Sequence, residues 1–449
     1  MKRTYLIALL CLALVAALFS SCSSAATAST APEGTAGKQS LTFWHSMGGS
    51  GGEAIDKMVA DFNASQSEIQ VTAQFQGSYD DAITKLQSVI GTDAVPDIMQ
   101  LYDIGTRWMI DSGHTVPIQE QIDADGWDIS QIEPNIAGYY TVDGKLNSMP
   151  FNSSTPILYY NKDAFREAGL DPEAPPENWN QLEEYSQKLT RTEGGETLYG
   201  FTLQVYSWLF EQYMSKQSLT YADNGNGRNG TATAVEFDSN GGGVNLLTKW
   251  NDLYKKGLLG NLGRDGTACI NAFGAGKTFM IMGSTASISE VRTAVDGKFE
   301  IGTGFLPDLE EGENGGVSIG GGSLWMMDKG TDDSKAAAWE FIKYMVEPER
   351  QVYWHQQTGY FPISVKAYDL PEMQAHLEAN PLFQTAIDQL HASPVEARGA
   401  LLGVFTEARQ TVEKNIETML DGSQTPEQAV EAMAGSINSS IEKYNIANS

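Results

Sequence analysis

Basic residues are scarce in this chain. It carries 29 lysines and arginines against 57 aspartates and glutamates, which gives a formal net charge of -28 at pH 7. A surface of that sign keeps an exposed protein in solution but repels the phosphates of nucleic acid, so we expect no nucleic-acid partner. An anionic small molecule would bind only where a local basic group overcomes the general field.

Cysteine and histidine are also sparse. Of the three cysteines, Cys11 and Cys22 belong to the N-terminal end, which leaves Cys269 alone in the rest of the chain. No internal disulfide is therefore available, and we interpret Cys269 as a buried thiol. The five histidines are scattered, with no H-E-x-x-H motif and no cysteine pair beside them. We expect no metal site and no cofactor.

Long apolar runs are missing beyond the N-terminus. The run over residues 5–19 follows two basic residues and is shorter than the roughly 20 residues of a membrane span, which indicates an export signal. Two serines and Cys22 come next, and this end resembles the lipobox of bacterial lipoproteins. We expect a signal peptide over 1–21, lipidation of Cys22 and an extracytoplasmic protein anchored to a membrane. An ordinary secretory signal is the alternative.

The rest of the chain divides into a tether and a large body. Residues 22–40 are mostly Ser, Ala, Thr, Gly and Pro, which predicts a flexible tether. The body from about residue 41 to 449 is longer than one core comfortably supports, which predicts two lobes. Asn and Gly alternate over 223–230, and we interpret that stretch as a flexible surface turn.

The start of the body alternates between strand and helix patterns. Apolar or alternating runs predict strands at 41–45, 69–75 and 97–102, and apolar stripes at helical spacing predict helices around 55–62 and 83–90. Strands and helices in alternation with short connections are typical of a parallel sheet, so the predicted fold class is α/β. Later in the chain, Pro348 looks like the first residue of a helix, and Thr425 with Gln428 forms a capping box.

Polar and aromatic residues follow the ends of the predicted strands. In open parallel sheets, ligands bind beyond the carboxyl ends of the strands. The residues at those ends are Trp44, His45, Ser46, Gly77, Ser78, Tyr79 and Asp103. This mixture suits a polar small molecule.

A glycine cluster at 48–52 is the best sign of an enzyme. It fits G-x-S-x-G, with Ser50 between a strand and a helix, where the nucleophile of a serine hydrolase lies. However, four glycines in five residues favour a loose loop whose amides face a ligand, because amides that open a helix attract anions. We therefore predict no catalytic residue, with a surface esterase using Ser50 as an alternative.

Four blocks of the sequence resemble one family. They are the F-W-H-S-M run at 43–47, the P-F-N-S-S-T-P run at 150–156 with its continuation to 162, the segment 319–325 and the segment 354–362. Through them, the chain resembles the extracellular solute-binding proteins of ABC importers, in the glycerol-3-phosphate-binding branch. The resemblance implies the two-lobe periplasmic-binding-protein fold, with several hinge crossings and the ligand in the cleft between the lobes. It places the crossings near residue 151, at 302–307 and at 347–353, hence an N-terminal lobe of 41–150 and 303–353 and a C-terminal lobe of 151–302 and 354–449.

The resemblance also implies the ligand-binding residues. The matching positions here are Tyr79, Asp103, Ser154, Trp208, Ser284, Gly321, Tyr360 and Arg409. Arg409 is expected to grip a phosphate while hydroxyls and the Gly321 amide donate to it. Asp103 is expected at the opposite end of the ligand, accepting from glycerol hydroxyls, and Trp208 forms a wall that can hold a choline cation.

Two positions depart from the family pattern and leave the substrate open. Asp103 stands where the family has Glu, and Val205 replaces the first of two tryptophans, so only Trp208 matches. The function implied is a substrate-binding lipoprotein that captures glycerol-3-phosphate, or a diester such as glycerophosphocholine, and delivers it as a monomer to the permease subunits. The alternatives are an oligosaccharide- or polyol-binding protein of an ABC importer and, outside that class, the esterase or a bare adhesin.

Overall fold

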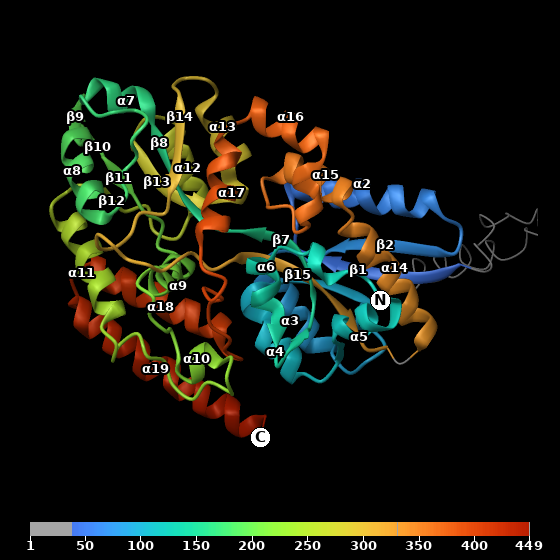
Figure 1. Ribbon diagram of the computed structural model, residues 1–449. Helices are drawn as coiled ribbons and strands as arrows, with labels where there is room; N and C mark the ends of the chain where they lie inside the picture. The colour runs from blue at the N-terminus through green and yellow to red at the C-terminus, as the bar shows by residue number, and fades with distance from the viewer. Residues whose placement is uncertain (1–37, 330, 449) are drawn as a thin grey trace, which may run out of the picture. The chain divides into compact units, whose positions relative to one another are not determined.

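The computed structural model describes residues 38–329 and 331–448 (Figure 1). The predicted signal peptide, the lipidation site Cys22 and most of the predicted tether lie outside the described residues. Within the described part, no helix is both long enough and apolar enough to cross a membrane.

The first sheet is mixed. The strands β2 (Ile69–Phe75), β1 (Gln39–His45) and β3 (Ile98–Tyr102) run parallel in that order, which confirms the predicted alternation at the start of the body. β15 (Gly320–Met327) lies antiparallel to β3 and pairs with β4 (Thr115–Val116) and β7 (Met149–Ser154). The antiparallel half of this sheet comes from segments that are distant in sequence.

Helices cover this sheet, and two of them do so through the predicted apolar stripes. They include α2 (Gly49–Ser65), α3 (Tyr79–Val89), α14 (Asp332–Met345) and α15 (Pro348–Thr358), the last beginning at proline as predicted. Phe341 of α14 packs edge-to-face on Phe43 and Phe62, with ring centroids 5.5 and 5.1 Å apart. Burial of each such ring contributes roughly 1.5–3 kcal/mol to holding the helices on the sheet.

The second sheet has five strands in the order β12 (Leu259–Gly260), β11 (Phe201–Thr202), β13 (Met280–Ser284), β8 (Pro156–Asn161) and β14 (Ile301–Phe305). β8 is antiparallel to both of its neighbours. The helices of this lobe include α8 (Trp179–Leu189), α9 (Ser207–Lys216), α11 (Gly242–Lys255), α12 (Gly266–Gly274), α13 (Ile288–Val295), α18 (Phe405–Leu420) and α19 (Pro426–Ala447). The predicted capping box of Thr425 and Gln428 opens α19.

Shorter elements complete the fold. They are α4 (Thr106–Asp111), α5 (Ile118–Asp125), α6 (Pro134–Tyr140), the pair β5 (Thr141–Val142) and β6 (Lys145–Leu146), α7 (Lys162–Glu167), the pair β9 (Arg191–Glu193) and β10 (Glu196–Leu198), α10 (Asp223–Gly227), α16 (Pro371–Ala379) and α17 (Leu382–Ala392).

The chain passes between the sheets more than once, as Figure 1 shows around β7 and β15. It leaves the first sheet between β7 and β8 and returns between β14 and β15. A further passage follows α15, which packs on α2, and precedes α18, which packs on α9 and α19. The predicted boundaries at residues 150 and 302 thus fall inside β7 and β14. The extent of each lobe as a moving unit stays a prediction.

Candidate ligand-binding site

A cavity of about 400 Å³ has walls from both lobes. The first lobe supplies the segments that follow β1 and β3 and the ends of β7 and β15 that meet there. The second lobe supplies the start of α9, the end of β13 and one turn of α18. All eight predicted ligand-binding residues line this one cavity: Tyr79, Asp103, Ser154, Trp208, Ser284, Gly321, Tyr360 and Arg409. Tyr79 and Asp103 follow their strands as the strand-end pattern predicts.

Gly321 must be glycine at this place. Its φ is +100°, and a Cβ there would lie 1.8 Å from the carbonyl oxygen of Asn152 on the neighbouring strand. At Gly320, a Cβ would lie 2.7 Å from the indole ring of Trp208. The two glycines therefore let β15 approach β7 closely and let Trp208 reach over the strand.

A chain of amide side chains fixes Tyr79. Gln100 accepts a hydrogen bond from the backbone N–H of Ser46 at 2.9 Å and donates to Oδ1 of Asn152 at 2.8 Å. Nδ2 of Asn152 then donates to the hydroxyl of Tyr79 at 2.8 Å. The Tyr79 hydroxyl is the acceptor in this bond, and it also interacts with the Tyr360 hydroxyl. Burial raises the pKa of Tyr79 well above its ordinary value, so the hydroxyl stays a donor.

Two aromatic stacks hold the tyrosines of the cavity in place. The Tyr79 ring lies on Tyr102 with centroids 5.1 Å apart and an angle of 14° between the planes. The Tyr360 ring lies on Trp354 at 5.8 Å and 13°. Both hydroxyls are therefore presented by rings with little freedom to move, which lowers the entropic cost of binding.

Arg409 is paired with two carboxylates. Its Nε and Nη2 donate to the two carboxylate oxygens of Glu211 at 2.7 and 2.8 Å, and Nη2 also lies 3.3 Å from Oδ2 of Asp103. The expectation that Asp103 lies at the opposite end of the ligand is therefore wrong. The physical reason is burial, because a guanidinium that is only 8% exposed needs opposite charge beside it.

This arrangement shifts the pKa of both partners. Burial raises the pKa of Asp103 to about 6, with Arg409 acting against that rise and Glu211 adding to it. For Arg409, burial alone would lower the pKa, but Glu211 and Asp103 outweigh it and raise the pKa further above its ordinary value. At neutral pH, Asp103 and Arg409 therefore both carry charge.

Residues 57–385 match the bacterial extracellular solute-binding proteins. The chain belongs to this family. It is 33% identical over 414 residues to the sn-glycerol-3-phosphate-binding periplasmic protein UgpB of Shigella flexneri serotype 5b (strain 8401), and the match covers 90% of this chain and 93% of the relative. The same figures hold for UgpB of Escherichia coli (strain K12). The family predicted from the sequence blocks is confirmed.

Solved structures show the same fold. UgpB from Mycobacterium tuberculosis in complex with glycerophosphocholine has a TM-score of 0.77 at 21% identity, over 91% of this chain and 100% of that one. The cyclic alpha-maltosyl-1,6-maltose binding protein from Arthrobacter globiformis has a TM-score of 0.74 at 24% identity, again over 91% and 100%. This solute-binding chain therefore has the predicted two-lobe α/β fold.

Two residues that belong to the site or contact its arginine were not predicted from the sequence. Tyr206 lines the cavity, and the Arg409 guanidinium lies 5.8 Å from its ring centroid, whereas Val205 is fully buried elsewhere. Tyr206 and Trp208, with ring centroids 6.0 Å apart, form the aromatic wall of this solute-binding protein. Glu211 is the second missed residue. It follows Trp208 by three positions in α9, and that helical spacing is the signal that places both on one face.

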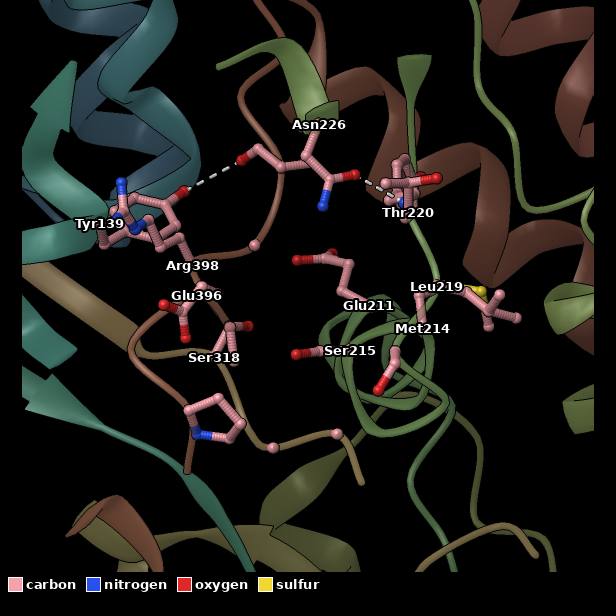
Figure 2. A pocket seen from close by; sticks show the side chains of 18 of the residues that line it. Tyr139, Glu211, Met214, Ser215, Leu219, Thr220, Asn226, Ser318, Glu396 and Arg398 are labelled. Atoms are coloured by element: carbon pink, nitrogen blue, oxygen red, sulfur yellow. Dashed lines mark hydrogen bonds between the residues drawn. The ribbon is translucent and has the colours of Figure 1, made fainter. Parts of the chain in front are cut away.

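A smaller cavity of about 230 Å³ is lined by two members of the arginine cluster, Asp103 and Glu211, and Figure 2 shows it from close by. Figure 2 shows the Glu211 carboxylate directed into it, with Ser215 and Ser318 nearby. Asp103 lines both cavities, while Arg409 lines only the larger one. The ion cluster is thus a shared wall between the two spaces.

Ser50 and Cys269, which were both singled out in the sequence, lie in different surroundings. Ser50 lines the large cavity, but no histidine in the described part of the chain hydrogen-bonds to it. Cys269 is buried as predicted, and burial raises its pKa to about 11. Across the residues that the structure describes, no group of three or more His, Cys, Asp or Glu side chains could hold a metal ion.

Proposed function

We propose that this solute-binding protein captures a phosphorylated glycerol, either glycerol-3-phosphate or a diester such as glycerophosphocholine, and delivers it to an ABC permease. The observation that carries the proposal is the convergence of all eight predicted residues on one cavity. The relatives that share 33% identity, named for binding sn-glycerol-3-phosphate, support the same ligand class.

The groups on the cavity wall suit a phosphate joined to a glycerol. A phosphate oxygen can accept from Nη1 of Arg409, which the bonds to Glu211 and Asp103 leave available, and from the Tyr79 hydroxyl. Asp103 adjoins the arginine, and its carboxylate can also accept from the hydroxyls of a molecule as short as glycerol. A ligand that lacks those hydroxyls would leave the buried carboxylate without that partner, which disfavours it.

Binding would favour closure of the lobes because both contribute contacts. Next to the cavity, the Tyr102 hydroxyl of the first lobe lies 2.6 Å from Oγ1 of Thr406 on α18, beside the contact between Asp103 and Arg409. Shifting a two-state equilibrium from 1:99 to 99:1 takes about 5.5 kcal/mol of differential binding. A few hydrogen bonds to charged groups, made only in the closed form, supply a free energy of that order.

The location and the assembly belong to the same proposal. The family and the periplasmic relatives support action outside the cytoplasm. We propose in addition that the lipid is attached at Cys22 and that the protein works as a monomer. Replacement of Cys22 by Ala should then release the protein from membranes into the soluble fraction.

Isothermal titration of the mature protein with glycerol-3-phosphate, glycerophosphocholine and maltose tests the function. Heat with either phosphorylated glycerol, and none with maltose, supports the proposal. Binding of maltose alone would favour the oligosaccharide alternative, for which the aromatic wall of Tyr206 and Trp208 is the supporting feature. The absence of heat with all three would overturn the proposal.

A further inference from the structure

Arg409 is held by a carboxylate that stands outside the ligand cavity. Glu211 forms the bidentate pair with it, yet Glu211 lines the smaller cavity (Figure 2) and not the ligand cavity. Glu211 belongs to α9 and Arg409 to α18, and both helices are in the second lobe. The pair therefore stays together when the lobes move, whereas Asp103 reaches it from the first lobe.

The ion pair of Arg409 and Glu211 is largely buried, and a neighbouring serine hydrogen-bonds to Glu211. The side chains of Arg409 and Glu211 are 9% and 11% exposed. The Ser207 hydroxyl donates to Oε1 of Glu211 at 3.3 Å, and the Ser207 backbone N–H donates to Glu413 at 3.2 Å. In such a place, charges interact more strongly than in water and are screened less by salt. Glu211 thus fixes the direction of the guanidinium and offsets its charge.

The charge balance of the cluster bears on which phosphate it prefers. Asp103 and Glu211 together outweigh Arg409 by one unit of negative charge when all three are ionised. A phosphate monoester has a second pKa near 6 and carries close to two negative charges in mildly alkaline solution. A diester carries one. The extra charge of the monoester meets a cluster that is already negative, so it is disfavoured relative to the diester.

We propose that Glu211 is a positioning and specificity-determining residue, which orients Arg409 toward the phosphate and, together with Asp103, makes the site prefer singly charged phosphodiesters to doubly charged monoesters. This inference rests on the proposed function. One unit charge at a few ångströms, at an effective dielectric constant of about 20, changes the preference by roughly tenfold or more.

The test compares two ligands in matched variants. Dissociation constants for glycerol-3-phosphate and its methyl diester are measured by titration calorimetry at about pH 8 in wild type, Glu211→Gln, Glu211→Asp and Glu407→Gln. Glu407 lies on α18, the helix of Arg409, but is exposed, so Glu407→Gln removes the same charge where solvent screens it.

The expected result is a change in the ratio of the two constants. Glu211→Gln should move the ratio toward the monoester by about tenfold, even if both ligands bind more weakly because Arg409 is less well held. Glu211→Asp and Glu407→Gln should keep the wild-type ratio within about twofold. A purely structural ion pair would weaken both ligands alike, so an unchanged ratio in Glu211→Gln would overturn the inference.

The charge preference can also be tested with the wild-type protein alone. This test does not depend on whether a variant folds correctly. Wild-type protein should bind the methyl diester of glycerol-3-phosphate about tenfold more tightly than the monoester at the same pH, because the methyl group removes one charge. Equal or weaker binding of the methyl diester would overturn the charge preference. If neither ligand binds the wild type, the proposed function itself fails, which is a distinguishable outcome.

Discussion

The two walls of the ligand cavity are built differently. The first-lobe wall presents the Tyr79 hydroxyl and the Gly321 backbone, fixed by strand pairing and by the amide chain through Asn152, with the Asp103 carboxylate beside them. The second-lobe wall presents charge and aromatic surface, with Arg409 on one helix and Trp208 on another. The first wall positions the ligand, and the second binds it mainly through electrostatic attraction. Substitutions in the two walls should therefore affect folding stability and ligand affinity to different degrees.

The largest effect should come from Arg409→Ala in the charged wall. It removes the phosphate ligand and leaves Glu211 and Asp103 as buried charges without their counter-ion. We expect binding to weaken by about 100-fold or more and stability to fall by about 3–5 kcal/mol. Calorimetry and denaturant unfolding measure the two losses. Arg264→Ala, which breaks a partly exposed pair with Glu413 and Glu417, is the control and should cost less than about 1 kcal/mol.

Gly321→Ala should disturb the backbone of the first-lobe wall. A methyl group there meets the Asn152 carbonyl oxygen and sits on a residue with positive φ, so β15 must move away from β7. We expect a loss of about 3 kcal/mol or more in the free energy of unfolding, together with loss of ligand binding. Gly435→Ala in α19, where a Cβ has open space, should instead stabilise by about 0.5–1 kcal/mol. Similar melting temperatures for the two variants would contradict the argument.

Asp103 joins the two walls, and its titration should be visible in stability. Its pKa of about 6 lies above the ordinary 3.8, so the folded state binds the proton more tightly than the unfolded state does. This group therefore favours folding below about pH 4, and that contribution is lost as the pH rises through 6. Asp103→Asn should stabilise the protein by about 2–3 kcal/mol at pH 7 relative to wild type. The difference between the two proteins should vanish near pH 4 in thermal melts, and a difference independent of pH would refute the assignment.

The smallest effect should come from Tyr79→Phe, which removes one neutral donor. Loss of one uncharged hydrogen bond to the ligand should weaken binding by about tenfold. The Asn152 amide also loses its acceptor, which should cost about 1 kcal/mol of stability. Tyr368→Phe, at a hydroxyl that donates to the Pro362 carbonyl instead of lining the cavity, should leave the dissociation constant unchanged.

Local patterns predicted the local structure well. The strand at 69–75, the helix that begins at Pro348 and the capping box at Thr425 are all present, because each depends on residues close together in sequence. The mixed first sheet was not predicted. Its pairing of Gly321 with Ser153 joins residues far apart in the chain, and no local period encodes it.

The site shows the same division. The eight residues implied by the family resemblance line one cavity, but Glu211 was not foreseen because its role depends on α9 packing against α18. The stretch 223–230, which we interpreted as a flexible surface turn, is hydrogen-bonded through Arg228 to a distant segment of the chain. That guanidinium donates to the carbonyl oxygens of Arg398 at 2.7 Å and Gly399 at 2.8 Å. A partly buried cation held by main-chain carbonyls cannot be predicted from composition.

The contact between Asp103 and Nη2 of Arg409 has a consequence for release of the cargo. A phosphate oxygen bound at Nη1 joins a guanidinium whose charge Asp103 and Glu211 already offset, so the electrostatic gain on capture is moderate. Both carboxylates stay beside Arg409 when the ligand leaves, so the guanidinium is never left without a counter-ion. We therefore expect a low free-energy barrier to release of the ligand to the permease. A low barrier suits a binding protein that goes through many rounds of capture and delivery.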